Sequence, residues 1–379
     1  MNKEQIIVIH IFASLNAGGA ESRILDVYRK IDRNRVQFHF ISLDTQSHQF
    51  YEEEILSLGG KIYKIPSPRE IGFVKHFRQL KSIFKHYFVN NAVVHSHTLH
   101  HSGLVLLAAR ASGLKTRIAH ARSTSSRHKG FVSRMFVNIG RILINMNATY
   151  RLGVVSEANA FLYGKRNINK PNTLVIPNAI DLESYMTVAE EEIKSLKEEY
   201  NLLNAKYIIG HVGRFETMKN HTFLIKVFDS FLKENKDSVL VLIGSGRLKN
   251  ETEELVRKLG LSDHIRFLGT RRDINKWMNI FDLVVVPSLF EGMCGVVLES
   301  QAAGTPCLCS VNVPNPVDMN LGIVRFIELS QPLQFWVENM EELLKINKVP
   351  NNKIVARFQE RKFSLDEEIT TLYRLYGVN

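Results

Sequence analysis

Short apolar runs rich in β-branched residues recur along this chain and alternate with segments whose apolar residues fall at helical spacing. The runs predict buried strands, and the periodic segments between them predict helices. Strands are expected at 6–12, 38–43, 61–65, 92–96, 117–120, 152–155, 207–212, 239–243, 266–268, 283–286 and 307–310. Because strands and helices alternate, the pattern predicts an α/β fold of doubly wound parallel sheets.

The clearest of these units lies between residues 282 and 310. A strand at 283–286 is followed by a Pro-Ser stop, a helical pattern from about Cys294 to Ala303, a Gly-Thr-Pro turn and a second strand at 307–310. Parallel sheets bind ligands beyond the carboxyl ends of their strands. We therefore expect residues 290–296 at a ligand edge, with N–H groups at the helix start able to hold an anion.

Two carboxylates, Glu291 and Glu299, lie eight residues apart in this unit. One interpretation is that Glu291 supports the helix dipole and Glu299 is a solvated surface residue. The other is that the helix start binds phosphate while a carboxylate binds sugar hydroxyls, as a nucleotide sugar requires. The E-x7-E spacing and the A-A-G-T-P turn resemble the donor-site signature of the retaining glycosyltransferases of family four. That resemblance implies the GT-B fold, two Rossmann-like doubly wound domains facing a central cleft.

The length of the chain suits two domains, since 379 residues with 45% apolar residues can build two Rossmann-sized cores. We expect an N-terminal acceptor domain at 1–185 and a donor domain at 186–360. Residues 361–379 are expected to supply the helix that returns to the first domain in GT-B enzymes. The segment 175–181 resembles the interdomain P-N-G-[IV]-D of the family, with Ala179 in place of the usual Gly.

The cysteines and the apolar runs bear on the compartment. Cys294, Cys307 and Cys309 fall within sixteen positions, which gives neither a disulfide framework nor a four-ligand zinc site. Cys307 and Cys309 alternate along a predicted strand and are expected in the core. We interpret the apolar run at 6–15 as a first strand rather than a signal segment, and no run is long enough for a membrane span. The sequence thus predicts a cytoplasmic protein.

The net charge of +11 is concentrated in the first half of the chain, where residues 1–185 carry 25 Lys and Arg against 12 Asp and Glu. An anionic membrane surface or an anionic acceptor is favoured, whereas no nucleic-acid-binding motif is present. Segments 73–88 and 131–146 predict basic amphipathic helices. The basic residues of the first segment are Lys75, Arg78, Lys81 and Lys85. Those of the second segment are Arg134 and Arg141, with Arg127 and Lys129 just before it. Either the two helices only pack on their own sheet, or at least one also contacts the cytoplasmic leaflet as a peripheral membrane site.

Candidate chemistry in the first half lies at strand ends. The adjacent Gly18 and Gly19 follow the first strand and could let a ligand approach the backbone. His95, His97 and His120 end two other strands, and three histidines can bind a metal, but no carboxylate nearby completes such a site. The run R-I-A-H-A-R resembles the family segment whose His contacts the transferred sugar, which implies that role for His120. Arg122 departs from the commoner His or Asn, and His97 is a lesser candidate.

Two cations follow the strand at 207–212, in the sequence GRFETMK. Such residues are usually solvated, but a departing nucleoside diphosphate needs fixed positive charge. The G-R-x4-K pattern resembles the family's diphosphate site, which implies that role for Arg214 and Lys219. Because the chain has no Asp-x-Asp pair, no metal is expected.

The remaining donor-site positions follow from the same resemblance. Gly244-Ser-Gly246 lacks a third glycine and is weak evidence for a dinucleotide site. Arg271 is a candidate nucleobase contact, and Cys294 at a helix start is expected to be partly activated as a thiolate. The expected catalytic residues are His120, Arg214, Lys219 and Glu291. The donor-binding residues are Gly18, Gly19, Arg214, Lys219, Arg271, Glu291, Gly292, Met293, Cys294, Gly295, Val296 and Glu299.

The resemblance as a whole is closest to bacterial capsule and exopolysaccharide glycosyltransferases. It implies a retaining enzyme that moves a sugar from a UDP-sugar or similar donor to a saccharide, expected to be lipid-diphosphate-linked. Two alternatives stay open from the sequence. One is a nucleotide-sugar epimerase of similar architecture, and the other is a non-catalytic membrane-associated scaffold for polysaccharide assembly.

Overall fold

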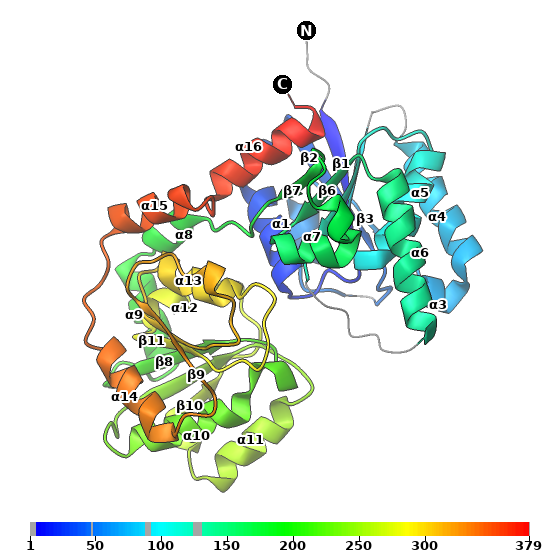
Figure 1. Ribbon diagram of the computed structural model, residues 1–379. Coiled ribbons are helices and arrows are strands. Elements are labelled where there is room, and N and C mark those ends of the chain that lie inside the picture. Colours follow the sequence, from blue (N-terminus) through cyan, green and yellow to red (C-terminus); the bar gives the residue numbers. More distant parts are fainter. Residues whose placement is uncertain (1–4, 47, 88–91, 124–130, 379) are drawn as a thin grey trace. The chain divides into compact units, whose positions relative to one another are not determined.

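A computed structural model describes residues 5–46, 48–87, 92–123 and 131–378, without the side chains of 131–133. The chain forms two compact units. Unit 1 comprises Met1–Ala179 and Leu365–Asn379, and unit 2 comprises Ile180–Ser364 (Figure 1). The boundaries expected from the sequence are residues 185 and 360. Phe88, Arg127 and Lys129 of the predicted basic helices lie outside the described residues. Among the described helices, none has the length and apolarity needed to cross a bilayer.

The described part of unit 1 contains a parallel sheet in the order β3-β2-β1-β4-β5-β6-β7. Its strands are β1 (Ile6–Phe12), β2 (Val36–Ser42), β3 (Ile62–Lys64), β4 (Val93–Ser96), β5 (Arg117–Ala121), β6 (Tyr150–Gly153) and β7 (Thr173–Val175). The strand order reverses between β1 and β4, so the carboxyl ends of these two strands form the switch point at which such sheets bind ligands.

Helices cover both faces of this sheet (Figure 1). They are α1 (Gly19–Lys30), α2 (Glu52–Ser57), α3 (Pro68–Ile71), α4 (Phe73–His86), α5 (Ser102–Ala111), α6 (Phe131–Asn147), α7 (Ser156–Tyr163) and α16 (Leu365–Tyr376), with short 3-10 turns η2 (Leu99–His101) and η3 (Lys165–Asn167). The last helix, α16, packs on α1, and its Leu365, Ile369 and Leu372 belong to the same buried cluster as Ile24 and Val27. Helices α4, α5 and α6 lie against the opposite face.

The described sheet of unit 2 is also parallel, in the order β10-β9-β8-β11-β12-β13. Its strands are β8 (Ile208–Val212), β9 (Val239–Ile243), β10 (Ile265–Phe267), β11 (Leu283–Val286), β12 (Cys307–Ser310) and β13 (Val324–Ile327). The order again reverses, here between β8 and β11. The carboxyl ends of β8 and β11 therefore mark the expected ligand edge of unit 2.

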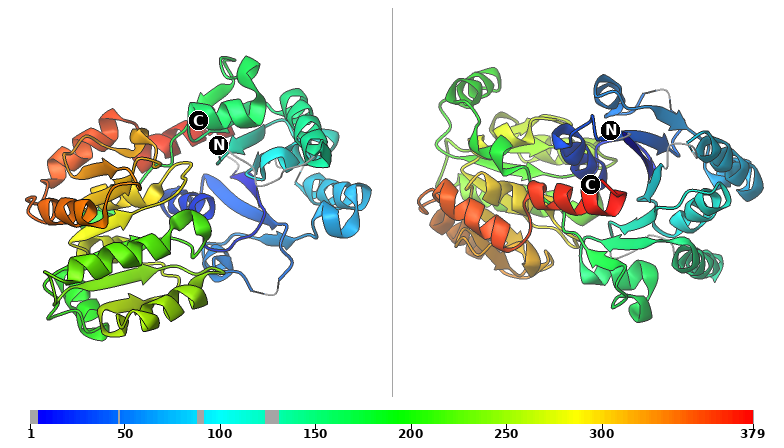
Figure 2. Two further views of the ribbon diagram at one scale, coloured as in Figure 1. Left: turned by 60° about the horizontal axis from the view of Figure 1, so that its bottom comes forward. Right: turned by 90° about the horizontal axis from the view of Figure 1, so that it is seen from above.

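Helices cover the faces of this second sheet (Figure 2). Two buried clusters of apolar side chains hold them there. One contains residues of α10 (His221–Leu232), α11 (Lys249–Lys258) and α14 (Leu333–Leu343), and the other residues of α8 (Leu182–Met186), α12 (Ile274–Ile280), α13 (Gly295–Ala302) and α15 (Asn351–Glu360). The remaining elements are α9 (Glu190–Glu199), η4 (Thr217–Lys219), η5 (Ser262–His264) and η6 (Asn315–Val317).

The predicted strands 6–12, 239–243, 283–286 and 307–310 coincide with β1, β9, β11 and β12. The prediction of 152–155 was two residues too late, since β6 ends at Gly153. Strands β7 and β13 were missed altogether. Both are short and largely half-exposed, so neither has the continuous apolar run that marks a buried strand.

Candidate functional site

The loop after β11 and the start of α13 form the predicted ligand edge of unit 2. Cys294 is the N-cap of α13 and makes no side-chain hydrogen bond to the first turn. The first N–H groups of a helix have no partner within the helix, so this start can receive an anion. There is also room for a ligand beside Gly295, because a Cβ added at this residue would meet nothing within 4 Å. The structure thus confirms the predicted strand, loop and helix arrangement.

A second loop is tied to this one by backbone contacts. The N–H of Leu289 donates to the carbonyl of Met218 over 2.8 Å. Asn220, which adopts the left-handed conformation at φ 57°, donates from Nδ2 to the carbonyl of Pro287 over 3.1 Å. These bonds hold η4, which ends at Lys219, beside the loop that carries Glu291. Lys219 and Glu291, which are 72 residues apart in the sequence, are therefore brought together.

Lys219 and Glu291 form an ion pair at this place, with Nζ 2.7 Å from Oε1. The Ser288 hydroxyl donates to the same oxygen over 2.7 Å. Burial by itself would lower the pKa of Lys219, but the charge of Glu291 and the hydrogen bond to it favour the ammonium, and this pKa is raised above its usual value. Lys219 is therefore a fixed cation, and the two predicted site residues satisfy each other's charge in this structure.

Arg214 and Glu299 complete the predicted set in unit 2. Arg214 is exposed and close enough for its charge to oppose that of Lys219. Glu299 lies inside α13 and is only 8% exposed, which excludes the alternative of a solvated surface carboxylate.

The expectation of a reactive Cys294 was wrong. Its thiol is 1% exposed, and burial, together with the negative charge of Glu291, raises the pKa of this thiol far above the usual value. The helix start and Lys219 favour the thiolate but do not outweigh burial. Cys294 therefore contributes its backbone, not a nucleophile. Cys307 and Cys309 are buried in the core, as predicted.

The Gly244-Ser-Gly246 turn has a packing explanation. A Cβ on Gly244 would overlap the carbonyl oxygen of Gly213, and one on Gly246 would lie 2.6 Å from that of Phe215. Both glycines have positive φ, at 143° and 156°. The turn needs glycine so that the loop after β9 can pack on the loop after β8, and this positions the segment that carries Arg214.

The Arg271 side chain is held by its own unit. Its guanidinium makes a two-pronged pair with Asp273, at 2.9 and 2.7 Å, and donates to the Tyr200 hydroxyl over 3.0 Å. It also lies 5.8 Å from the ring centre of Trp277. The predicted contact with a nucleobase stays a prediction, and it would use a side chain that is already fixed.

In unit 1, Gly18 is the N-cap of α1 and Gly19 the first residue of that helix. A Cβ on Gly18 would overlap the Glu21 carboxylate, whereas one on Gly19 would meet nothing within 4 Å. The overlapping atom is the end of a flexible side chain, so a shift of Glu21 would make room and packing does not require a glycine at position 18. Only Gly19 leaves the open space that the predicted approach of a ligand requires.

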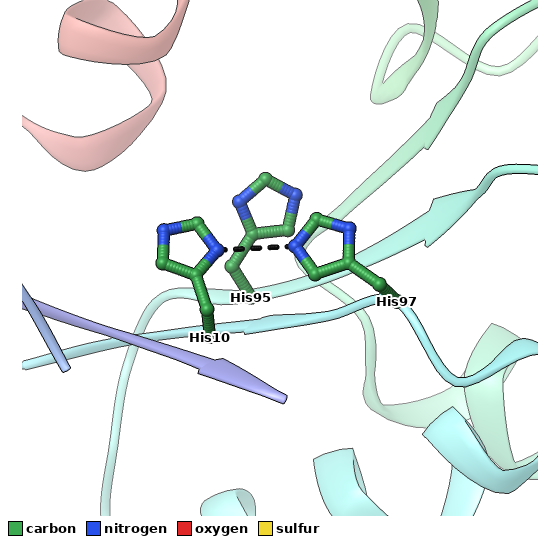
Figure 3. Close-up of side chains that lie close together, drawn as sticks. All are labelled: His10, His95 and His97. Atoms are coloured by element: carbon green, nitrogen blue, oxygen red, sulfur yellow. Dashed lines mark hydrogen bonds between the residues drawn. The ribbon is translucent and has the colours of Figure 1, made fainter. Parts of the chain in front are cut away.

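Four buried histidines gather at the carboxyl ends of β1, β4 and β5: His10, His95, His97 and His120. His10 Nδ1 lies 3.0 Å from His97 Nε2. Figure 3 marks this hydrogen bond with a dashed line. Burial is the largest cause of a strongly lowered pKa at all four, and the charge of Arg122 lowers these pKa values further. The imidazoles are therefore neutral near pH 7. One ring nitrogen each of His10, His95 and His97 lies within 4.8 Å of the others, so a metal could bind there by replacing the His10–His97 hydrogen bond.

His120 contacts two members of this group, His95 and His97. The Nδ1 of His120 is 3.1 Å from His95 Nε2. The Nδ1 of His95 is in turn 2.9 Å from the Tyr376 hydroxyl. Within the described residues, His120 Nε2 has no hydrogen-bond partner although it is buried. A buried polar atom without a partner needs an explanation, and a bound ligand is one.

Arg122, whose role the sequence left open, contacts the segment that ends unit 1. It donates from Nη1 to Asn178 over 2.6 Å and from Nε to His97 Nδ1 over 3.4 Å. Glu368 of α16 accepts from the N–H of Ala179 over 3.3 Å. Arg122 thus links the histidine group to the P-N-A segment at 177–179.

Four further residues belong to these networks and were not predicted from the sequence: His10, Ser288, Glu368 and Tyr376. His10 is a polar residue inside an apolar strand, and that was a usable signal. Glu368 lies 189 residues from its partner Ala179 in the P-N-A segment, and Tyr376 lies 281 residues from its partner His95 on β4. No local pattern reveals such a contact.

Comparison with protein families matches both units. The model described as "Glycosyltransferase Family 4" matches residues 17–184, and "Glycosyl transferases group 1" matches residues 192–352. The chain is 34% identical to the putative glycosyltransferase EpsF of Bacillus subtilis over 100% of its own length and 98% of that relative.

Other relatives are more distant. Identity is 25% to the capsular polysaccharide biosynthesis glycosyltransferase CapH of Staphylococcus aureus, over 78% of this chain and 79% of that relative. It is 26%, over 64% of each, to the UDP-Gal:alpha-D-GlcNAc-diphosphoundecaprenol alpha-1,3-galactosyltransferase of Escherichia coli. The solved structure of HepE from Anabaena with UDP-glucose superposes with a TM-score of 0.77 at 17% identity, covering 99% of this chain and 100% of that one. This likeness confirms the predicted GT-B fold.

Proposed function

The chain belongs to glycosyltransferase family 4, and we propose that this hexosyltransferase moves a sugar from a nucleoside diphosphate, most simply UDP, to a saccharide acceptor with retention at the anomeric carbon. The observation that carries the proposal is the convergence of Lys219, Glu291 and the start of α13 in unit 2. A donor of this class carries both a diphosphate and sugar hydroxyls, which these groups suit. The family leaves the epimerase and scaffold alternatives without support.

In the proposed reaction, the bond from the anomeric carbon to the diphosphate oxygen breaks, and a bond to the acceptor oxygen forms on the same face. The acceptor proton passes to the leaving phosphate oxygen. Lys219, Arg214 and the N–H groups from Cys294 to Val296 stabilise the diphosphate charge. The loop from Glu291 to Met293 borders this site.

Three further contacts belong to the proposal. Glu291 orients hydroxyls of the transferred sugar, Glu299 holds the ribose, and His120 binds the transferred sugar. No metal is needed, since two cations and a helix start supply the positive charge that a bridging ion would otherwise provide.

The acceptor that we propose is a lipid-diphosphate-linked saccharide in the synthesis of a capsule, an exopolysaccharide or a related surface glycan. Two of the relatives support it: the Escherichia coli enzyme is named for such an acceptor and the Staphylococcus aureus enzyme for capsule synthesis. The positive charge of residues 1–185 also suits an anionic lipid surface.

We expect UDP to stabilise the protein by about 2.7 kcal/mol at about 100 times its dissociation constant. Glu299→Ala should weaken this stabilisation, because the variant loses the proposed contact with the ribose. Thermal denaturation with UDP, GDP, ADP and their common sugars measures both effects. Glu338→Ala is the matched control, since Glu338 is exposed on α14 of the same unit. If no nucleotide raises the melting temperature of the wild type, unit 2 is not a donor site.

The membrane-facing surface that we propose lies on α6. Met135, Phe136, Ile139, Ile142 and Met146 recur at helical spacing and are all exposed, Met146 by 65%. Contiguous exposed apolar side chains of this kind mark interaction sites. The first turn of α4 continues the surface, because the Phe73 ring lies 6.4 Å from that of Phe136.

The charge around this surface suits anionic lipid. Neither α4 nor α6 contains an acidic residue. Helix α4 buries His76, Leu80 and Phe84 in its own unit, so its role at a bilayer is to present cations beside α6, not to insert. Each Lys or Arg near an anionic leaflet contributes about 1 kcal/mol.

We expect binding to vesicles that contain phosphatidylglycerol and weaker binding to neutral vesicles. Ile142→Glu should lower the partition constant tenfold or more, since burying an exposed Ile contributes about 1.5–3 kcal/mol. Vesicle flotation measures this loss. Leu203→Glu, at an exposed apolar residue of unit 2, is the matched control. Equal binding to neutral and anionic vesicles would exclude the charge argument, and unchanged binding of Ile142→Glu would exclude α6.

A further inference from the structure

A buried chain of three side chains runs from the last helix to the proposed sugar-binding residue. The Tyr376 hydroxyl lies 2.9 Å from His95 Nδ1, and His95 Nε2 lies 3.1 Å from His120 Nδ1. All three residues are at most 3% exposed. The chain ends at His120 Nε2, which has no partner among the described residues. What this nitrogen can offer a ligand depends on where the protons sit.

Two proton arrangements satisfy the two hydrogen bonds. In the first, the Tyr376 hydroxyl donates to His95 Nδ1, His95 Nε2–H donates to His120 Nδ1, and His120 carries its proton on Nε2. In the second, every bond runs the other way, and both the Tyr376 O–H and the lone pair of His120 Nε2 are left without a partner. The hydroxyl has no other acceptor among the described residues. The first arrangement leaves one buried group unmatched, the N–H at His120 Nε2, whereas the second leaves two. Each unmatched buried group is costly, so the first arrangement is favoured.

We propose that Tyr376 is a positioning residue, which through His95 fixes His120 as the tautomer with an N–H at Nε2. His120 then offers a hydrogen-bond donor, not a base, to an oxygen of the bound sugar. This inference rests on the proposed function, in which His120 binds the transferred sugar. It agrees with a reaction in which the leaving phosphate, not a side chain, takes the acceptor proton.

The neighbouring hydrogen bonds of Arg122, His97 and His10 run in a matching direction, with a donor left at the end. Arg122 Nε can only donate, so His97 accepts at Nδ1, carries its proton on Nε2 and donates to His10 Nδ1. His10 is thereby left with an N–H at Nε2, which likewise has no partner among the described residues. Both chains therefore end in a donor at the same group of strand ends.

The test is the tautomer of His120, read from the nitrogen-15 chemical shifts of its ring in the full chain labelled at histidine, with His120→Gln to assign the signals. The wild type should show a protonated Nε2 and a bare Nδ1. Tyr376→Phe removes the donor to His95, so His120 should populate both tautomers and kcat for sugar transfer should fall about tenfold with little change in the KM for the nucleotide sugar. Tyr373→Phe is the matched control, because its hydroxyl on the same helix contacts only the N–H of Asp32 among the described residues.

The outcomes separate the inference from the function on which it rests. A wild-type His120 protonated at Nδ1 would overturn the inference, whatever the activity. A Tyr376→Phe variant that loses activity while His120 keeps its tautomer would show only a structural role for Tyr376. If His120→Gln transfers sugar at the wild-type rate, the proposed contact with the sugar fails, while the ring nitrogen shifts still decide the tautomer.

Discussion

Lys219→Gln is expected to lower kcat/KM for sugar transfer by about 10²- to 10³-fold, the usual effect of removing one preorganised group that stabilises transition-state charge. The amide of Gln can still donate to Glu291, so the 2.7 Å contact with this carboxylate can persist. What is lost is the positive charge beside the departing diphosphate. Initial rates with saturating acceptor and varied nucleotide sugar measure the effect.

Lys249→Gln is the matched control for this variant. Lys249 also pairs with a glutamate, Glu253, but on an exposed face of α11 at 3.4 Å. An exposed pair contributes little, so its loss should leave both rate and stability almost unchanged. A rate within about threefold of the wild type corresponds to a change of less than about 0.7 kcal/mol in the activation free energy. If Lys219→Gln keeps such a rate, Lys219 does not stabilise the leaving group.

Glu368→Gln is expected to remove a large pH-dependent loss of stability. Burial is the main cause that raises the pKa of Glu368 from 4.5 to about 7, against the opposing effects of Arg122 and the N–H of Ala179. The native state therefore binds this proton more tightly than the unfolded chain. The contribution of Glu368 to stability is full below pH 4.5 and is lost as the pH rises through 7.

The size of this effect follows from the shift. One pKa unit corresponds to about 1.4 kcal/mol, so wild type should lose about 3 kcal/mol more than Glu368→Gln between pH 5 and pH 8. Urea denaturation at several pH values, with Glu367→Gln as an exposed control on the same helix, measures the difference. Parallel pH profiles for wild type and Glu368→Gln would contradict it.

The elements that the sequence predicted best are those with continuous apolar runs. β9, β11 and β12 are buried along their whole length, and their limits can be read from composition alone. β7 and β13 form the outer strands of their sheets and are half-exposed, so their sequences carry no such signal.

In the candidate site, too, local sequence signals predicted some features, whereas features that depend on tertiary packing were missed. Spacing and resemblance brought Lys219 and Glu291 together as site residues. Their direct ion pair could not be predicted, because it depends on the hydrogen bonds that join η4 to the loop after β11. The thiol of Cys294 was misjudged for a related reason: the helix start is local, whereas the burial that raises the pKa of this thiol comes from the packed core of unit 2.

The place of α16 has a consequence for synthesis of the protein. Unit 2 occupies residues 180–364, so all of it has been translated while unit 1 still lacks Leu365, Ile369 and Leu372 from its core. Domains generally fold in the order in which they leave the ribosome. Here unit 1 is translated first but completed last. A premature stop codon after residue 364 would therefore damage unit 1, although the stop lies at the end of unit 2.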